Sequence, residues 1–306
     1  MKIGFITSIL EDYTYEEMID TASALGFACV EAACWPAGGA ERRYAGVSHI
    51  DVGRVIEDES YRKHILSYAK ERNIEISALA YYPNTLSEDP EQREKAVEHL
   101  KAMIAAAPQL NVHTITTFIG RIQTLTVEEN LKIFKEVWTP IIRLAEKYKV
   151  KIAIENCPML FGADQWPGGQ NLMTTPAIWR KAFDLIPSEY FGLNYDPSHF
   201  VWQQMDYIKP LYEFREKIFH VHYKDIKVYH DKLSDVGTMA YPLDYMSPKL
   251  PGLGDVDWGK YVSALTDIGY NGYSCIEIED KAFEDSAERV LDALRLSYGY
   301  MRQFVI

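Results

Sequence analysis

The sequence predicts one (β/α)8 barrel, and three observations support this fold class. Short β-branched runs alternate with longer segments of helical period from one end of the chain to the other. Eight strand–helix pairs fit within 306 residues, and no linker or low-complexity segment interrupts them. A parallel sheet of eight strands closes on itself and buries both faces. An open doubly wound sheet is the alternative, but no glycine-rich phosphate motif follows the first strand, where the chain reads Ser8-Ile9-Leu10-Glu11-Asp12.

Four strand–helix pairs are predicted in the first half of the chain. The expected strands cover 2–8, 29–34, 74–81 and 113–120. The helices that follow them are expected at 15–25, 61–72, 90–107 and 127–148. Pro90 suits the first turn of its helix, where the missing N–H costs nothing. The last of these helices carries one apolar stripe, made by Leu131, Phe134, Trp138, Ile141 and Ala145.

The second half of the chain repeats this pattern with four more pairs. Its strands are expected at 150–156, 190–195, 218–224 and 272–278, and its helices at 176–185, 211–217, 258–268 and 286–304. Longer loops are expected at 35–58 and 228–257, within a single domain that covers 1–306. The second loop fits a lid over the site or a subunit contact, since it carries Met239, Tyr241, Tyr245 and Met246.

Composition and charge exclude several classes of protein. The 32 Lys and Arg residues against 44 Asp and Glu residues give a formal net charge of −12, which repels phosphate backbones, so no nucleic-acid partner is expected. No apolar stretch reaches the roughly 20 residues that a membrane span needs, and the first residues are not typical of a signal peptide. The four cysteines form no CxxC pair. We therefore expect a cytoplasmic protein that has no membrane partner.

The last four predicted strands each end near a side chain that can bind a metal ion. These side chains are Glu155, Asp196, His222 and Glu277. The chemistry of a (β/α)8 barrel lies where its strands end, and strands five to eight are neighbours, so the four groups can converge. Three carboxylates and one imidazole make a hard, oxygen-rich site that suits Mn²⁺, Mg²⁺ or Zn²⁺.

Each of these residues also has a purely structural interpretation. Glu155 could be a buried carboxylate paired with a lysine, and Asp196 before Pro197 is typical of a turn. His220 and His222 lie on one face of their strand, so at least one of them could be a core histidine. Four consecutive strand ends that carry such groups favour the metal interpretation.

Five motifs in the second half of the chain resemble those of a known superfamily. They are Ile-Glu-Asn at 154–156, Asp-Pro-Ser-His at 196–199, His-x-His-x-Lys-Asp at 220–225, Pro-Gly-Leu-Gly-Asp-Val-Asp-Trp at 251–258 and Gly-Tyr-Ser-Cys-Ile-Glu-Ile-Glu-Asp at 272–280. Over nearly its full length the chain resembles the sugar-phosphate isomerase/epimerase superfamily. These are xylose-isomerase-like TIM barrels, and they include ketose 3-epimerases, inosose dehydratases and AP endonucleases.

The resemblance implies one divalent metal ion and its ligands. The ligand positions are filled by Glu155, Asp196, His222 and Glu277. Mn²⁺ is the favoured ion, and Mg²⁺, Zn²⁺ and Co²⁺ are the alternatives. Glu279 faces the same way as Glu277 and could be the last ligand in its place. His199 matches a histidine that contacts the substrate or supports a ligand, and we count it among the expected catalytic residues.

By the same likeness, the expected activity is isomerisation or epimerisation of a sugar or keto-sugar. A divalent ion would stabilise the enediolate that forms when a proton leaves the carbon beside a carbonyl. In the resembling ketose epimerases, two glutamates that also touch the metal act on opposite faces of the enediolate. Glu155 and Glu277 fill those positions here, so they are the expected acid and base.

The substrate pocket is expected between loops that carry aromatic and basic side chains. The predicted substrate-binding residues are Trp35, Arg42, Asn84 and Lys224. Aromatic rings suit the apolar faces of a sugar, and an Arg or Lys suits a carboxylate or phosphate. The same side chains could instead pack the loops or lie in solvent.

Other functions stay open at this stage. Proton abstraction could expel a leaving group, which would make the protein a lyase: a dehydratase, or an enzyme that cleaves keto-glycosides beside a partner subunit. An AP endonuclease would need extra histidines and a basic face, whereas this chain has eight histidines and a net charge of −12. A sugar-binding subunit without chemistry would have no use for four ligand positions. A homo-oligomer is also compatible with the sequence.

Overall fold

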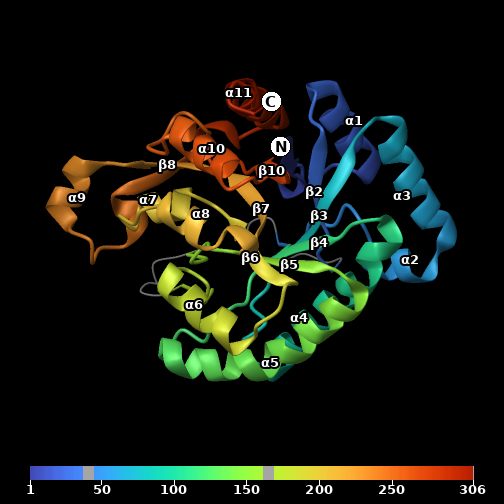
Figure 1. Cartoon of the computed structure of the whole chain (residues 1–306). Coiled ribbons are helices and arrows are strands. Elements are labelled where there is room, and N and C mark those ends of the chain that lie inside the picture. Colours follow the sequence, from blue (N-terminus) through green and yellow to red (C-terminus); the bar gives the residue numbers. More distant parts are fainter. Residues whose placement is uncertain (37–44, 161–168, 306) are drawn as a thin grey trace.

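Eight parallel strands form a closed barrel in the computed structural model, and helices surround it (Figure 1). The structure describes residues 1–36, 45–160 and 169–305. Around the barrel the strand order is β1-β10-β7-β6-β5-β4-β3-β2, so barrel strands that follow one another along the chain are neighbours. The predicted fold, a single (β/α)8 TIM barrel, is confirmed.

Each barrel strand lies within its predicted range and is no longer than that range. The strands are β1 (Lys2–Ile6), β2 (Cys29–Ala33), β3 (Glu75–Tyr81), β4 (Thr114–Thr117), β5 (Lys151–Glu155), β6 (Phe191–Tyr195), β7 (Ile218–Tyr223) and β10 (Tyr273–Ile276). Most predicted ranges were too long at the carboxyl end. At that end, the last residues of these predicted ranges do not pair with a neighbouring strand and belong to the loops that carry the candidate site.

The helices around the barrel begin at clear local signals. The main ones are α1 (Tyr15–Leu25), α3 (Glu59–Glu71), α4 (Pro90–Ala106), α5 (Val127–Tyr148), α6 (Pro176–Leu185), α8 (Lys209–Glu213), α10 (Trp258–Asp267) and α11 (Ala287–Met301). Thr14 and Thr126 form capping boxes with the glutamates three residues later. Thr175 caps α6 just before Pro176. For α1, α5 and α6, both observed ends match the prediction.

Two segments expected to be loops contain secondary structure. The first, 35–58, includes α2 (Val52–Glu57), which the side chain of Asp51 caps. The second, 228–257, belongs to an insertion in which β8 (Asp225–Val228) pairs antiparallel with β9 (Met246–Lys249). Between these strands, α9 (His230–Val236) projects from the barrel (Figure 1). The helix expected at 211–217 is α8 followed by a 3-10 turn over Arg215–Lys217, because Phe214 leaves the helical conformation.

One buried carboxylate, that of Asp225, organises the base of this insertion. Its Oδ1 accepts hydrogen bonds from the backbone N–H groups of Ile226 (2.8 Å) and Val256 (3.1 Å). Its Oδ2 accepts from the backbone N–H of Gly252 (2.9 Å) and from the Trp258 indole N–H (2.8 Å). The motif at 251–258 therefore folds around the residue that ends the motif at 220–225.

Apolar side chains fill the space between barrel and helices, whereas several buried polar side chains lie inside the barrel. The stripe predicted on α5 is buried in full, from Leu131 to Ala145. The polar interior includes Glu31, Ser77, Thr116, His220 and His222. None of the helices in the described part of the chain is both long and apolar enough to cross a bilayer.

Candidate functional site

Four strand-end side chains come together at the carboxyl end of the barrel. Glu155 is the last residue of β5, Asp196 follows β6, His222 lies in β7, and Glu277 follows β10. These four strands are consecutive neighbours around the barrel. One ligand atom from each side chain lies within 4.8 Å of the others. The residues expected to converge are thus adjacent in space.

The atoms that face the centre of this cluster lack hydrogen bonds. Among the described residues, Glu155 Oε1, Asp196 Oδ2, His222 Nδ1 and Glu277 Oε2 are buried and have no hydrogen-bond partner. Buried polar atoms in native proteins nearly always have such a partner, so a set of four that converges needs an explanation. A divalent cation would satisfy all four, and three carboxylates with one imidazole fit Mn²⁺, Mg²⁺ or Zn²⁺. The residues present therefore fit a metal ion.

Lys224, which follows β7, points its ammonium group at the same carboxylates. Its Nζ lies 3.2 Å from Glu277 Oε2, 3.4 Å from Asp196 Oδ2 and 4.0 Å from Glu155 Oε1. Burial would lower the pKa of Lys224, but the surrounding carboxylates outweigh burial and raise the pKa well above its ordinary value. Lys224 therefore carries a positive charge that partly balances the acidic cluster.

Glu279 contacts Lys224 and not the ligand cluster. Its Oε2 lies 3.3 Å from Lys224 Nζ, and its side chain is 29% exposed. Glu277 is 15% exposed and places Oε2 3.2 Å from His222 Nδ1. Of the two glutamates, Glu277 is the one that belongs to the converging group of four.

The two glutamates of the cluster differ in their proton affinity. Burial raises the pKa of Glu277, and the neighbouring carboxylates of Glu155 and Glu279 raise it further against the opposing charge of Lys224. Burial also raises the pKa of Glu155, but His199 and His222 beside it outweigh burial and lower the pKa below its usual range. Two carboxylates whose pKa values are pushed apart are typical of an acid and a base that act together.

His199 lies beside the cluster on the short helix α7 (Ser198–Val201). Its Nε2 is 3.2 Å from Asp196 Oδ2 and 3.5 Å from Glu155 Oε1. Its Nδ1 accepts a hydrogen bond from the indole N–H of Trp202 at 3.5 Å. With Nδ1 accepting, the N–H of the ring is on Nε2 and faces the carboxylates.

Asp196 is held in place from both sides. Asn156 accepts a hydrogen bond from the backbone N–H of Asp196 at 2.8 Å and donates one to its carbonyl at 2.9 Å. The Oδ1 of Asp196 accepts from the backbone N–H of Ser198 at 2.8 Å. These contacts fix the carboxylate so that its other oxygen, Oδ2, faces the centre.

Glu31 is a functional candidate that the sequence reasoning missed. It lies in β2, its side chain is fully buried, and its Oε2 is 2.9 Å from Nε2 of His222. Its Oε1 accepts hydrogen bonds from the hydroxyl groups of Tyr82 (2.5 Å) and Thr116 (2.6 Å). The signal that could have found it is one charged residue within the otherwise apolar strand sequence of β2.

The predicted substrate-binding residues have different surroundings. Trp35 is half-buried and packs edge-on against Tyr81, with 4.8 Å between ring centroids. The amide of Asn84 bonds to the backbone N–H and carbonyl of Arg121 and to the backbone N–H of Leu86, so it shapes the loops. Lys224 lies in the cluster, as described above. Arg42 lies outside the described residues.

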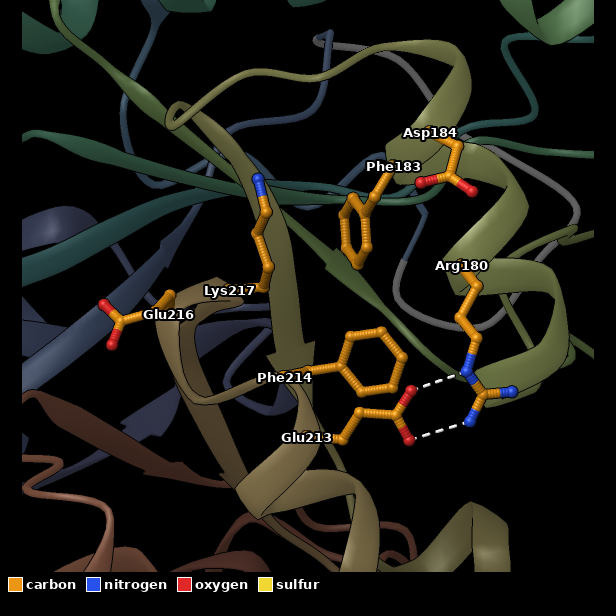
Figure 2. A pocket seen from close by; sticks show the side chains of 7 residues that line it. All are labelled: Arg180, Phe183, Asp184, Glu213, Phe214, Glu216 and Lys217. Carbon is orange, nitrogen blue, oxygen red and sulfur yellow. Dashed lines mark hydrogen bonds and ion pairs between the residues drawn. The ribbon is translucent and has the colours of Figure 1, made fainter.

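A surface hollow of about 420 Å³ lies between residues of α6, such as Arg180, and residues of α8, such as Glu213 (Figure 2). Its lining includes Phe183 near the end of α6 and Lys217 directly before β7. The hollow therefore lies at the end of the barrel where strands begin. Arg180 and Glu213 form a two-pronged ion pair across it (Figure 2). None of the groups of metal-capable side chains among the described residues lies in this hollow, so we place the site at the opposite end.

Comparison with known proteins gives curated sequence relatives and solved structures of the same fold. An inosose dehydratase of Clostridium perfringens (strain ATCC 13124) is 27% identical over 239 residues, which cover 72% of this chain and 75% of the relative. The crystal structure of D-psicose 3-epimerase from Clostridium cellulolyticum H10 has a TM-score of 0.71 at 16% identity and covers 100% of this chain and 99% of its own. The IolI protein with a bound zinc atom has a TM-score of 0.71 at 19% identity and covers 99% of each chain.

The family comparison covers most of the barrel. A family model described as the xylose isomerase-like TIM barrel matches residues 19–298. This range contains all four residues of the cluster and the strands that carry them. The chain belongs to the xylose isomerase-like TIM barrel family.

Proposed function

We propose that the protein is a divalent-metal-dependent isomerase or epimerase that acts on a sugar or keto-sugar. The observation that carries the proposal is a set of four buried ligand atoms that have no hydrogen bond within the described residues and converge within 4.8 Å; they belong to Glu155, Asp196, His222 and Glu277. Their position at the carboxyl ends of the strands is where barrels of this fold carry out chemistry. The sugar epimerase among the structural neighbours supports the same class of substrate.

The metal would be held by these four residues. When bound, a divalent cation supplies Lewis-acid stabilisation for the negative charge that develops on a carbonyl oxygen. Mn²⁺ is our first choice because the donor set is rich in oxygen, and the zinc atom of the IolI structure makes Zn²⁺ the leading alternative.

Proton transfer is assigned to Glu155 and Glu277. Glu155 ends β5 and Glu277 follows β10, and two strands separate them in the barrel, so the carboxylates approach the centre from different sides. One carboxylate would remove the proton from the carbon beside the carbonyl, and the other would return a proton to the opposite face. Either glutamate could act as the base, since both would be carboxylates beside a bound cation.

Two cationic or protonated groups flank the reacting position. The Lys224 ammonium and the His199 Nε2–H both face the carboxylates and would bind substrate oxygens or move a proton to them. Trp35, Asn84 and Arg42 remain our candidates for the wall of the substrate pocket. The partner is then a small sugar or keto-sugar.

Elimination is the second candidate, because the curated relative described above is an inosose dehydratase. His199 could donate its Nε2 proton to a departing hydroxyl or glycosidic oxygen after the same proton abstraction. Epimerisation and elimination share the first step and differ in what leaves the substrate. The products therefore separate the two reactions.

The test uses the Mn²⁺-loaded protein in D₂O with free ketoses, an inosose and 3-keto-glucosides. We expect solvent deuterium at the carbon beside the carbonyl, measured by NMR and mass spectrometry. An epimer of unchanged composition supports epimerisation, whereas release of water or of an aglycone supports elimination. Glu155→Gln and Glu277→Gln should each reduce exchange by about 10²–10⁴-fold, and Glu279→Gln is the matched control that should keep most of it. Full exchange activity in both variants would overturn the mechanism.

A further inference from the structure

We infer that Glu31 is a positioning residue that holds the imidazole of His222 so that Nδ1 faces the metal. The inference rests on the proposed function, since it takes His222 to be a metal ligand. Glu31 belongs to β2, which is not a neighbour of β7 in the barrel order, so the two side chains meet across the barrel interior. Both are fully buried.

The two nitrogens of His222 face different groups. Nδ1 points to the cluster, where it lies 3.2 Å from Glu277 Oε2 and 3.8 Å from Glu155 Oε1 and has no hydrogen bond within the described chain. Nε2 points to the interior, where it lies 2.9 Å from Glu31 Oε2 and 2.8 Å from the amide nitrogen of Asn194. A carboxylate can only accept, so Glu31 draws the ring N–H to Nε2, and the Asn194 amide then donates to the Tyr82 hydroxyl at 3.3 Å. Nδ1 then has a lone pair available for a metal ion.

The carboxylate of Glu31 is itself fixed. The hydroxyl groups of Tyr82 and Thr116 donate to Oε1 at 2.5 Å and 2.6 Å, which leaves Oε2 for the imidazole. A carboxylate on the far nitrogen of a ligating histidine orients the ring and makes it a stronger ligand.

The same residues also resemble a second metal site, but their contacts argue against one. Glu31, His220 and His222 place one ligand atom each within 4.8 Å. Both oxygens of Glu31 already accept hydrogen bonds. His220 Nδ1 lies 3.1 Å from Asn194, and its Nε2 lies 3.2 Å from Ser77. This inner cluster is therefore a hydrogen-bonded support, in contrast to the outer cluster, whose converging atoms have ion pairs but no hydrogen bonds within the described residues.

The test compares Mn²⁺ affinity, measured by competition with a chelator, in the wild-type protein and in Glu31→Gln. Gln keeps the shape of the side chain but removes the negative charge that accepts the hydrogen bond from Nε2–H, so the imidazole is held less strongly. We expect the affinity to fall by about 10–100-fold. Tyr82→Phe, which removes one donor to Glu31, should give a smaller loss in the same direction. Glu279→Gln removes the same charge without touching His222, and its affinity should stay within a few-fold of wild type.

A second readout reports the imidazole directly. In the Zn²⁺-loaded protein labelled with ¹⁵N-histidine, His222 should show a protonated Nε2 with slow solvent exchange, and Glu31→Gln should speed that exchange. Unchanged Mn²⁺ affinity and unchanged Nε2–H exchange in Glu31→Gln would overturn the role of Glu31 while leaving the proposed function intact. A wild-type protein that binds no Mn²⁺, Zn²⁺ or Co²⁺ would overturn the metal site itself, and this inference with it. Circular dichroism of Glu31→Gln and Tyr82→Phe verifies that both variants are folded.

Discussion

The ammonium group of Lys224 neutralises part of the negative charge of the cluster. It is 2% exposed and lies within 4.0 Å of four carboxylates. Carboxylates so close together repel one another strongly in a medium of low dielectric constant. The protein without metal therefore relies on this ammonium group, whereas a bound cation would take over much of the neutralisation.

Replacing Lys224 by Met should destabilise the metal-free protein more than the metal-loaded one. Removal of one partner from a buried ion pair typically costs about 3–5 kcal/mol. We expect a loss of that order in the free energy of unfolding in EDTA, and a clearly smaller loss in saturating Mn²⁺. Urea denaturation in both buffers measures the difference. Lys227→Met, which removes an exposed ion pair with Asp255, is the control and should cost at most about 1 kcal/mol in either buffer.

Equal losses for Lys224→Met in EDTA and in Mn²⁺ would contradict this account. Such a result would mean that Lys224 stabilises the fold through packing of its aliphatic stem, independently of the charge at the cluster.

At the scale of the element, local signals explain which predictions from sequence are correct. Thr14 and Thr126, each followed three residues later by a glutamate, determine where α1 and α5 begin. In contrast, α2 has only six residues, which is too short for a periodic apolar pattern to be visible. The pairing of β8 with β9 joins residues about twenty positions apart, and nothing local specifies it.

Replacing a glycine by alanine should have opposite effects on stability in strand β6 and in helix α11. Gly192 lies in β6, where an added Cβ would be 2.3 Å from the carbonyl oxygen of Lys217, part of the backbone. Gly299 lies in α11, and an added Cβ there would have nothing within 4 Å. We expect Gly192→Ala to lower the unfolding temperature and Gly299→Ala to raise the free energy of unfolding by about 0.5–1 kcal/mol. Thermal unfolding of both variants is the measurement, and a Gly192→Ala protein as stable as wild type would show that β6 and the segment before β7 can separate freely.

At the scale of the whole molecule, the sequence predicts which strand-end residues of the candidate site converge, but it does not reveal the residue that contacts them from across the barrel. The order of strands predicts that Glu155, Asp196, His222 and Glu277 meet, because a barrel brings the ends of consecutive strands together. Glu31 contacts this group from β2, on another part of the barrel wall. A contact across the interior depends on the tilt and stagger of closed strands, and no pattern along one strand reveals it.

Because the four proposed ligands come from β5, β6, β7 and β10, metal binding should stabilise one part of the barrel more than the rest. We expect Mn²⁺ to slow backbone hydrogen–deuterium exchange in these strands more than in β3 and β4, since opening them requires release of the ion. Mass spectrometry of peptides from both parts, with and without Mn²⁺, measures the effect. Protection spread evenly over all eight strands would show that the barrel opens only as a unit.

Asp225 also fixes the points at which the insertion leaves the barrel and returns to it. The insertion leaves the barrel and returns to it at one carboxylate, which binds the N–H of Ile226 at the start and of Val256 at the end. The segment between them can lengthen, shorten or change sequence at little cost in loop-closure entropy, because both of its ends are anchored at a shared point. Lys224 is the residue just before that anchor. The insertion is thus a part of the chain that can change while the barrel and its acidic cluster stay unchanged.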